Sequence, residues 1–550
     1  MILDSLDPSL TPNDDERPPW ESSSLSDMKL DASAGSEEET LEVYEKAKNF
    51  NTLKLVSGNT IEGNIENYIA EHYGSEGKSR CNLAKFLMKK LNLIPARDVL
   101  LALACNKPAR IIIATAGAGK TTSLHLDLCI SKLYDKATGN NVLAPAKVEG
   151  TEYYYSPILY LNYNKHNVQP ILDRHHQMVA SINRCLRAEE RISDNIESST
   201  VHAFCRKWLD ARKYGEESSV DQTGLEIIPE EKKQKVWEAV ITPRLTKFYG
   251  DSESAPEVSY TVLDSLYTYK VESMMSWESF FISAKFVDSG LRDDFVKSCI
   301  KKYDSMKKAM GLVDFTDYLL QMIDYLKENP EFLEELQKRY HIIIADENQD
   351  FTALMNELLL LLHNPKYNRL IVVGDPDQTI YQFKGVSTDN VVSLYQRLPD
   401  VALLGLDTNY RCPDKIVDAA KRILDMNILR FKKPILTVKT GGEIIEVPSS
   451  YAGQQEKQVI SMVSKLSREE QERTVITYRN NSSAQSIAEE LYYAGIPFRM
   501  LDGTRPFNSP AFRHIKEAMQ ALAEKDNPKL NAQLYRFLPL PKARWDEILE

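Results

Sequence analysis

The 550-residue chain lacks long apolar runs: no stretch approaches the ~18 consecutive apolar residues of a membrane-spanning helix. It also begins without the basic and apolar segments of a secretory signal. Its seven cysteines are scattered, and none forms a CxxC pair or shares a metal-binding spacing with histidine. We therefore expect no transmembrane helix, no zinc site, and reduced thiols in an intracellular protein, cytoplasmic or, in a eukaryote, nuclear.

The chain lacks an excess of positive charge: it has 68 basic and 79 acidic side chains and a net charge of −11, which is unusual for a protein that binds nucleic acid. The distribution of charge weakens that argument. Residues 1–48 carry 13 acidic and 4 basic side chains, and the remaining 502 residues have a net charge of only −2. The Ser, Asp, Glu and Pro content of the first segment predicts a disordered acidic tail. The nearly neutral body still allows a basic groove.

Four short apolar runs, rich in β-branched residues, organise the body of the chain. They are residues 110–115, 157–161, 341–346 and 369–374, and each ends in a polar or glycine-containing cluster. Such runs are typical of parallel strands that helices cover on both faces. Ligands bind at the carboxyl ends of strands in such sheets. We therefore expect an α/β fold in which the polar clusters share one edge of a parallel sheet.

The strand pattern disappears between residues 206 and 310, where charged and aromatic residues at helical spacing predict a helical insertion. A second α/β segment is expected from residue 396, with a strand near residues 474–478 and a helix over residues 483–493, which the break at Gly495-Ile-Pro497 ends. No internal repeat is evident.

A glycine-containing loop follows the run that ends at Thr115. It reads Ala114-Thr-Ala-Gly-Ala-Gly-Lys-Thr121 and matches GxxxxGK[ST] at every position but the first. Its glycines let backbone N–H groups turn toward phosphate oxygens, and the helix that follows adds its N-terminal dipole. This pattern predicts a nucleoside triphosphate site in which Lys120 pairs with the β- and γ-phosphates and the Thr121 hydroxyl binds Mg²⁺. The predicted nucleotide contacts are Ala114, Thr115, Ala116, Gly117, Ala118, Gly119, Lys120, Thr121 and Thr122.

An acidic cluster, residues 346–350, follows the third apolar run. Asp346 is suited to hold Mg²⁺, usually through water, and Glu347 to polarise the attacking water. An acidic turn alone is more often a solvated loop, and the assignment depends on the phosphate-binding loop before it and on the cluster that follows.

The cluster after the fourth run, residues 374–385, contains Gln378, whose amide is suited to sense a γ-phosphate. Tyr381 and Phe383 lie just beyond, and they are suited either to stack on a base or to pack in the core. Farther along, Arg411 could reach a γ-phosphate across a cleft, and Tyr410 could stack on adenine.

Together these clusters resemble the superfamily 1 helicases of the UvrD/Rep type, in the family's order, over about residues 80–540. The matching segments are residues 114–121 (A-x-A-G-x-G-K-T), 158–165, 200–204 (T-V-H-A-F), 314–319 (D-F-T-D-Y-L), 346–350 (D-E-N-Q-D), 374–385 (G-D-P-D-Q-T-I-Y-Q-F-K-G), 406–411 (L-D-T-N-Y-R) and 475–507.

The resemblance implies two RecA-like domains, 1A and 2A, with ATP and Mg²⁺ between them and single-stranded DNA or a duplex junction across the top. It implies domain 1A over residues 49–205 and 311–395, insertion 1B over residues 206–310, the first part of 2A over residues 396–522, and the start of a 2B-like insertion over residues 523–550. It implies Glu347, Gln378 and Arg411 in catalysis, Thr121 and Asp346 at the metal, and Tyr410 on adenine. It implies DNA contacts by Tyr163, His202, Phe204 and Phe383.

The sequence departs from the family at two places. Arg97 stands where the family's adenine-binding glutamine is expected. The second half of 2A, with its second phosphate-binding arginine, is expected to be lacking. Two functions follow. One is an ATP-dependent DNA helicase that moves 3′ to 5′, with a chain supplying the C-terminal half or a nuclease as a candidate partner. The other is an ATP- and DNA-binding regulatory module without turnover. A P-loop kinase for a small molecule fits the later motifs poorly.

Overall fold

The four apolar runs form neighbouring strands of one parallel sheet, as predicted. The computed structural model describes Leu53 and residues 55–147, 154–214, 226–250, 256–427, 430–449, 454–478 and 481–500. The runs are β2 (Ala109–Ala114), β5 (Ile158–Asn162), β9 (Ile342–Ala345) and β10 (Arg369–Gly374), and the sheet also contains β1 (Val56–Ser57), β6 (Glu197–Thr200) and β11 (Val401–Leu406). The order is β1-β11-β2-β10-β9-β5-β6, and each neighbouring pair is parallel.

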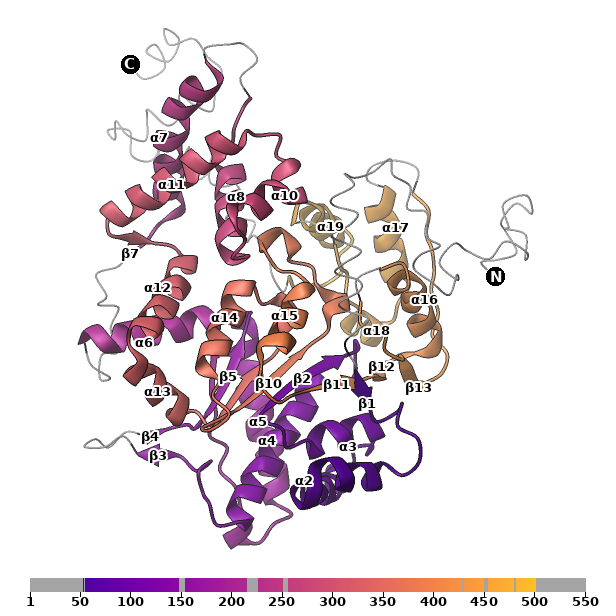
Figure 1. Cartoon of the computed structure of the whole chain (residues 1–550). Coiled ribbons are helices and arrows are strands. Elements are labelled where there is room, and N and C mark those ends of the chain that lie inside the picture. The colour runs from indigo at the N-terminus through magenta and orange to yellow at the C-terminus, as the bar shows by residue number, and fades with distance from the viewer. Residues whose placement is uncertain are drawn as a thin grey trace, which may run out of the picture. The chain divides into compact units, whose positions relative to one another are not determined.

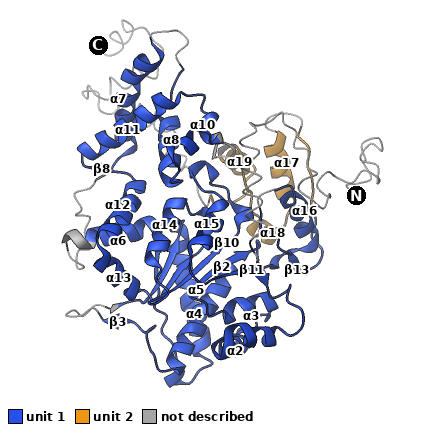
Figure 2. Ribbon diagram, in the orientation of Figure 1, with its two compact units in different colours: residues 1–443 blue, residues 444–550 orange. Residues whose placement is uncertain are grey.

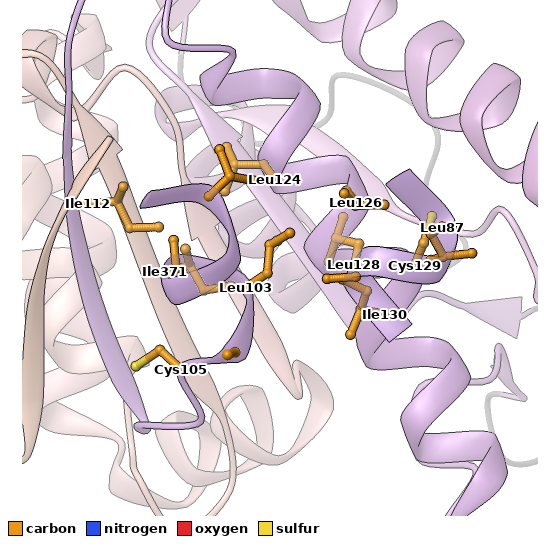
Figure 3. Packing of buried hydrophobic residues seen from close by; sticks show 14 of the residues in the cluster. Leu87, Leu103, Cys105, Ile112, Leu124, Leu126, Leu128, Cys129, Ile130 and Ile371 are labelled. Atoms are coloured by element: carbon orange, nitrogen blue, oxygen red, sulfur yellow. The ribbon is translucent and has the colours of Figure 1, made fainter. Parts of the chain in front are cut away.

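Helices cover both faces of this sheet (Figure 1). One face packs against α2 (Ile65–Lys90), α3 (Arg97–Ala104), α4 (Lys120–Ala137) and α5 (Val168–Asn183), and the other against α6 (Val201–Tyr214), α12 (Phe315–Glu328), α13 (Pro330–Arg339), α14 (Ala353–Leu362) and α15 (Asp389–Arg397). Successive residues of a strand point to opposite faces of the sheet. On the face covered by α3 and α4, Ile112 and Ile371 pack with Leu103 and Leu124 (Figure 3). Burial on both sides explains why these strands are apolar throughout rather than alternating.

The predicted helical insertion is present and has a core of its own. It contains α7 (Glu230–Tyr249), α8 (Tyr260–Glu272), α9 (Trp277–Phe281), α10 (Ala284–Val287) and α11 (Asp293–Ala309), and its ends meet where β7 (Glu226–Ile227) pairs with β8 (Leu312–Val313). The indole of Trp237 stacks on the ring of Tyr303 with centroids 3.9 Å apart. Buried Lys307 pairs with Asp314 at 2.5 Å and with Asp317 at 2.7 Å, so these two carboxylates fasten α11 to the start of α12.

The first sheet continues past residue 396, where the sequence analysis expected a second domain to begin. Strand β11 lies beside β2 with six residues in register. The next strands, β12 (Thr408–Pro413) and β13 (Leu436–Lys439), form a separate parallel pair, and α16 (Asp414–Leu424) lies between them in the chain. Earlier in the chain, β3 (Ala146–Lys147) and β4 (Tyr154–Tyr155) form a short antiparallel pair.

The chain divides into two compact units, residues 1–443 and residues 444–550 (Figure 2). The second unit contains α17 (Gln454–Val463), α18 (Arg468–Glu472) and α19 (Asn481–Tyr493), and Ile460, Val463, Leu491 and Ile496 form its core. The predicted helix over residues 483–493 is confirmed, but residues 474–478 form no strand. The predicted acidic tail and 2B-like segment lie outside the described residues. Among the described helices, none combines the length and the apolar character needed to cross a membrane.

Two histidines are buried beneath the sheet on the α4 and α5 side. His125 is 1% exposed and His175 is 0% exposed. Burial lowers the pKa of His125 to about 4, and burial together with nearby Lys132 lowers the pKa of His175 to about 2. Both imidazoles are therefore neutral in the folded protein at neutral pH.

The burial of His125 predicts a loss of stability in mild acid. Below pH ~6.5 the unfolded chain takes up a proton that folded His125 accepts only near pH 4, so stability falls as the pH drops through this window. His125→Phe keeps a ring against Tyr160, and urea unfolding should show that its stability declines by about 2 kcal/mol less than that of the wild type between pH 7.5 and 5. His72→Phe, at an exposed position, is the control, and equal pH dependence of all three proteins would contradict the prediction.

Candidate functional site

The predicted functional clusters meet at the carboxyl edge of the large sheet. Strand β2 leads into the phosphate-binding loop, β9 into Asp346, β10 into Asp375 and β5 into Tyr163. Since these strands are parallel neighbours, the residues that follow them lie along one edge (Figure 1). This edge is where an α/β sheet binds its ligands.

The loop between β2 and α4 has the geometry of an anion cradle. Gly117 and Gly119 have φ angles of +72° and +75°, and α4 begins at Lys120. A Cβ at Gly117 would lie 2.7 Å from the Asn409 side-chain oxygen and 2.8 Å from the Arg411 Cβ, so the loop also needs glycine for close approach. The first N–H groups of α4 therefore open toward the loop, as in phosphate-binding helix termini.

The segment after β11 packs directly on this loop. The backbone N–H of Thr115 donates to the carbonyl of Leu406 at 2.7 Å, and that of Tyr410 donates to the carbonyl of Gly117 at 3.0 Å. The Asn409 side-chain oxygen accepts the N–H of Arg411 at 2.7 Å. These contacts hold the exposed Arg411 side chain beside the loop, so the structure brings this predicted residue to the candidate phosphate site.

The acidic cluster faces the loop lysine. The Lys120 ammonium lies 3.2 Å from Glu347 Oε2, and the Gln349 amide donates to the same oxygen at 2.8 Å. Glu347 has a φ of +53°, in the left-handed region, which is uncommon for a residue other than glycine. This backbone turn points consecutive side chains of the cluster in different directions, and Glu347 is the one that meets Lys120.

Asp346 is buried behind Glu347. Burial and the negative charge of Glu347 raise the pKa of Asp346 to about 6, although the Tyr160 hydroxyl, which donates to Asp346 Oδ2 at 2.7 Å, opposes the shift. Burial and Glu347 likewise raise the pKa of Asp350 to about 6. Burial is the larger cause of both shifts and the charge of Glu347 the smaller, and a cation bound beside these carboxyls would lower their pKa values again.

The donor set at this edge fits Mg²⁺. Mg²⁺ is usually held by one or two carboxylates together with substrate phosphates and water, and a hydroxyl (Thr121) and a buried carboxylate (Asp346) are the protein groups available. The Lys120–Glu347 contact brings together the chain neighbours of these two groups, since Lys120 precedes Thr121 and Glu347 follows Asp346. In the described part of the chain no cluster of three or more His, Cys, Asp or Glu side chains forms a complete metal cage, so phosphate oxygens would have to complete the coordination.

Gln378 lies on the same edge, with its side chain exposed. Its amide donates to Asp375 Oδ2 at 2.6 Å. The backbone N–H of Asp375 in turn donates to the Gln349 side-chain oxygen at 2.9 Å. Gln349 therefore links Asp375 and Gln378, which follow β10, to Glu347, which follows β9. The clusters after these two strands form one hydrogen-bonded system.

Three aromatic rings and a lysine form a platform farther along the edge, which we call the aromatic platform: Tyr163, Tyr381, Phe383 and Lys384. Tyr163 and Tyr381 have ring centroids 5.3 Å apart, and Tyr381 and Phe383 6.1 Å apart. The Lys384 ammonium lies 5.1–5.9 Å from all three ring centroids. Phe383 is 52% exposed, so the alternative that it packs in the core is excluded.

Phe204 requires a correction. Its side chain is 0% exposed and packs against Trp208 and Tyr340 in the core, because α6 turns that face toward the sheet. It cannot stack on a base there. His202, two residues earlier, is only half-buried, and burial and the charge of Lys384 lower its pKa to about 4.

Phe315 is a further candidate for contact with DNA, and the sequence alone did not single it out. Its ring is 60% exposed and meets the His202 ring edge-on at 6.0 Å. The D-F-T-D segment already contained this residue, but nothing in the sequence separated an exposed phenylalanine from the buried residues that follow it.

Arg97, at the position expected to contact adenine, is committed elsewhere. Its guanidinium donates to the carbonyl of Gly58 at 3.0 Å and to that of Ile61 at 2.6 Å. The structure therefore gives Arg97 a role in holding the segment before α2.

Tyr410, the residue expected to stack on adenine, is half-buried, and burial raises the pKa of its hydroxyl to about 12.

Comparison with known sequences gives two family matches. Residues 98–399 match the UvrD/REP helicase N-terminal domain, and residues 404–547 match the UvrD-like helicase C-terminal domain. The second match shows that a C-terminal helicase domain is represented, and the expectation that the C-terminal motifs are lacking is not confirmed.

The chain is also similar to named helicases. It is 28% identical over 250 residues to the ATP-dependent DNA helicase PcrA of Staphylococcus epidermidis, a match that covers 45% of this chain and 34% of the relative. It is 29% identical over 259 residues to the ATP-dependent DNA helicase Rep of Salmonella typhimurium, which covers 46% of this chain and 38% of the relative. The chain thus spans about a third of the length of these curated relatives.

Proposed function

Because the chain belongs to the UvrD/REP helicase family, we propose that it hydrolyses ATP to drive movement along single-stranded DNA, in the 3′-to-5′ direction, and the opening of duplex junctions. One observation carries the proposal. The segment of residues 374–385 has the exposed Gln378 at the candidate phosphate site and the exposed Phe383 on the aromatic platform. A shift of Gln378 on nucleotide binding would therefore be transmitted over a few residues to a ring that can hold a base.

The residues at the loop divide the chemistry of hydrolysis among them. Lys120 and Arg411 neutralise the phosphate charge that grows in the transition state. Glu347 accepts the proton of the attacking water. Mg²⁺, held by Thr121 and Asp346, would neutralise the phosphate oxygens and orient them. The Lys120 ammonium lies 3.2 Å from Glu347, so a phosphate group that draws Lys120 toward itself would leave Glu347 free to act as a base.

The aromatic platform supplies contacts that tolerate any DNA sequence. Every base has a π-face, so rings such as Phe383 and Tyr381 bind single strands with little preference. Lys384 adds positive charge beside the rings and can meet the phosphate backbone. The partner is therefore single-stranded DNA, in the cytoplasm or, in a eukaryote, the nucleus.

The direct test is ATP hydrolysis with and without single-stranded DNA, followed by strand displacement on duplexes with a 3′ or a 5′ single-stranded extension. We expect hydrolysis to be stimulated by DNA and unwinding to need the 3′ extension. Tight ATP and DNA binding without any hydrolysis would instead support a regulatory module. Unwinding that needs the 5′ extension would contradict the direction.

Phe383→Ala should weaken binding of single-stranded DNA while leaving nucleotide binding intact. Loss of one stacked base costs about 1–3 kcal/mol, which corresponds to an affinity about 5- to 150-fold lower. Fluorescence anisotropy of a labelled oligonucleotide measures this change. Phe86→Ala is a matched control, because Phe86 is also an exposed phenylalanine beside a lysine, Lys90, with the ammonium 5.7 Å from the ring centroid. Unaltered DNA affinity in Phe383→Ala would remove this residue from the interface.

A further inference from the structure

A lysine outside the recognised clusters lies buried behind the candidate ATP site. Lys433 is on the stretch between α16 and β13, and its side chain is 2% exposed. Its ammonium lies 2.7 Å from Asp375 Oδ1 and 3.4 Å from Asp377 Oδ2, and it donates to the carbonyl of Ala114 at 2.9 Å. A buried ammonium is retained only where it is paired and hydrogen-bonded, and all three of these partners are oxygens at the ends of β2 and β10.

The partners of Lys433 connect it to the residues that handle the phosphates. Ala114 is the last residue of β2 before the phosphate-binding loop. Asp375 divides its carboxylate: Oδ1 meets Lys433, and Oδ2 accepts the amide of Gln378 at 2.6 Å. Through its backbone N–H, Asp375 is also bonded to Gln349, the neighbour of Glu347.

We propose that Lys433 is a positioning residue for Gln378, an inference that rests on the proposed role of Gln378 as the γ-phosphate sensor. The ammonium holds Asp375 by one oxygen, so that the other oxygen presents the Gln378 amide at the loop. Without the ammonium, Asp375 and Asp377 would be two buried carboxylates that lack its positive charge, and Arg430 would remain 3.5 Å from Asp377. Asp375 would then turn away, and Gln378 would lose its fixed position.

The position of Lys433 in the chain adds a second consequence. Lys433 lies three residues before β13, and β13 pairs with β12, the strand that contains Arg411. The small β12–β13 sheet therefore contains the arginine beside the loop, and the lysine that holds Asp375 is joined to it by a short stretch of chain. A displacement of this sheet would move Arg411 and release or tighten Gln378 in the same step.

The test is discrimination between nucleotides with and without a γ-phosphate. Titration calorimetry with Mg²⁺ gives the Kd of a non-hydrolysable ATP analogue and of ADP for the full chain, and their ratio reports the sensor. We expect Lys433→Met to reduce this discrimination at least tenfold while the Kd of ADP changes less than threefold. Lys432→Met, at the exposed neighbouring position, should match the wild type.

A second variant covers the case in which methionine leaves the carboxylates unpaired and the protein fails to fold. Lys433→Gln keeps a donor for Asp375 and Ala114 without the charge. It should unfold near the wild-type midpoint and still reduce the discrimination about threefold or more. Wild-type discrimination in either folded variant would overturn the inference, as would a wild-type protein that binds both nucleotides equally. The readout needs neither DNA nor hydrolysis, so absence of DNA-stimulated turnover would contradict the proposed function alone.

Discussion

Replacing Lys120 with alanine is expected to reduce ATP hydrolysis by at least about 100-fold, the usual consequence of removing a preorganised charge from a transition state. Lys120 begins α4 and has Glu347 as its ion-pair partner at 3.2 Å. Without the ammonium, the phosphates would face Glu347 and Asp346 with one positive side chain fewer. Nucleotide binding should weaken as well, because repulsion from these carboxylates would no longer be offset.

The measurements are titration calorimetry with Mg²⁺ and ATP, and steady-state hydrolysis in the presence of single-stranded DNA. Lys107→Ala is the control, since Lys107 precedes β2 at the opposite end of that strand and makes only an exposed pair with Asp400. Nucleotide affinity and turnover that both remain at the wild-type level in Lys120→Ala would refute the assignment of the phosphate-binding loop.

The large sheet could be predicted because each of its central strands is buried on two faces. Ile111 and Ile113 pack on one side and Ile112 on the other, and this requirement leaves a continuous apolar run in the sequence. Residues that follow such runs meet at one edge once the strands are parallel. For that reason the linear order of Lys120, Glu347 and Gln378 already contained most of the candidate site.

Other features depend on packing that no local pattern records. Phe204 and Phe383 are both aromatic residues in recognised clusters, yet Phe204 is enclosed by α6 and the core whereas Phe383 lies on a short turn at the edge. Strand β11 is apolar like the others, but its place beside β2 reflects a pairing across almost 300 residues of sequence. Lys433 gave no signal at all, because its partners are distant in sequence and an isolated lysine normally lies at the surface.

Asp127→Ala is expected to destabilise the first unit by about 3–5 kcal/mol, the cost of breaking a buried ion pair by removing one partner. Asp127 on α4 lies 2.5 Å from the Arg80 guanidinium and 2.7 Å from that of Arg110, and the three side chains are 4%, 0% and 2% exposed. Burial alone would raise the pKa of Asp127, but Arg110 and Arg80 outweigh it and lower the pKa below its ordinary value. The carboxylate therefore joins α2, α4 and β2 while it neutralises two buried cations.

Urea unfolding, followed by far-UV circular dichroism, measures the effect as a lower midpoint for the main transition. Two matched variants separate charge from size. Asp127→Asn keeps the shape and some hydrogen bonds, so it should lose less stability than Asp127→Ala. Glu334→Ala, which breaks the exposed pair with Lys338, should change the midpoint little.

Because Asp127 lies on the helix that begins at Lys120, a destabilised α4 should also weaken ATP binding in proportion to the unfolded fraction. An unchanged midpoint in Asp127→Ala would mean that the two arginines find other partners, and that the helix behind the phosphate-binding loop is held by its apolar face alone.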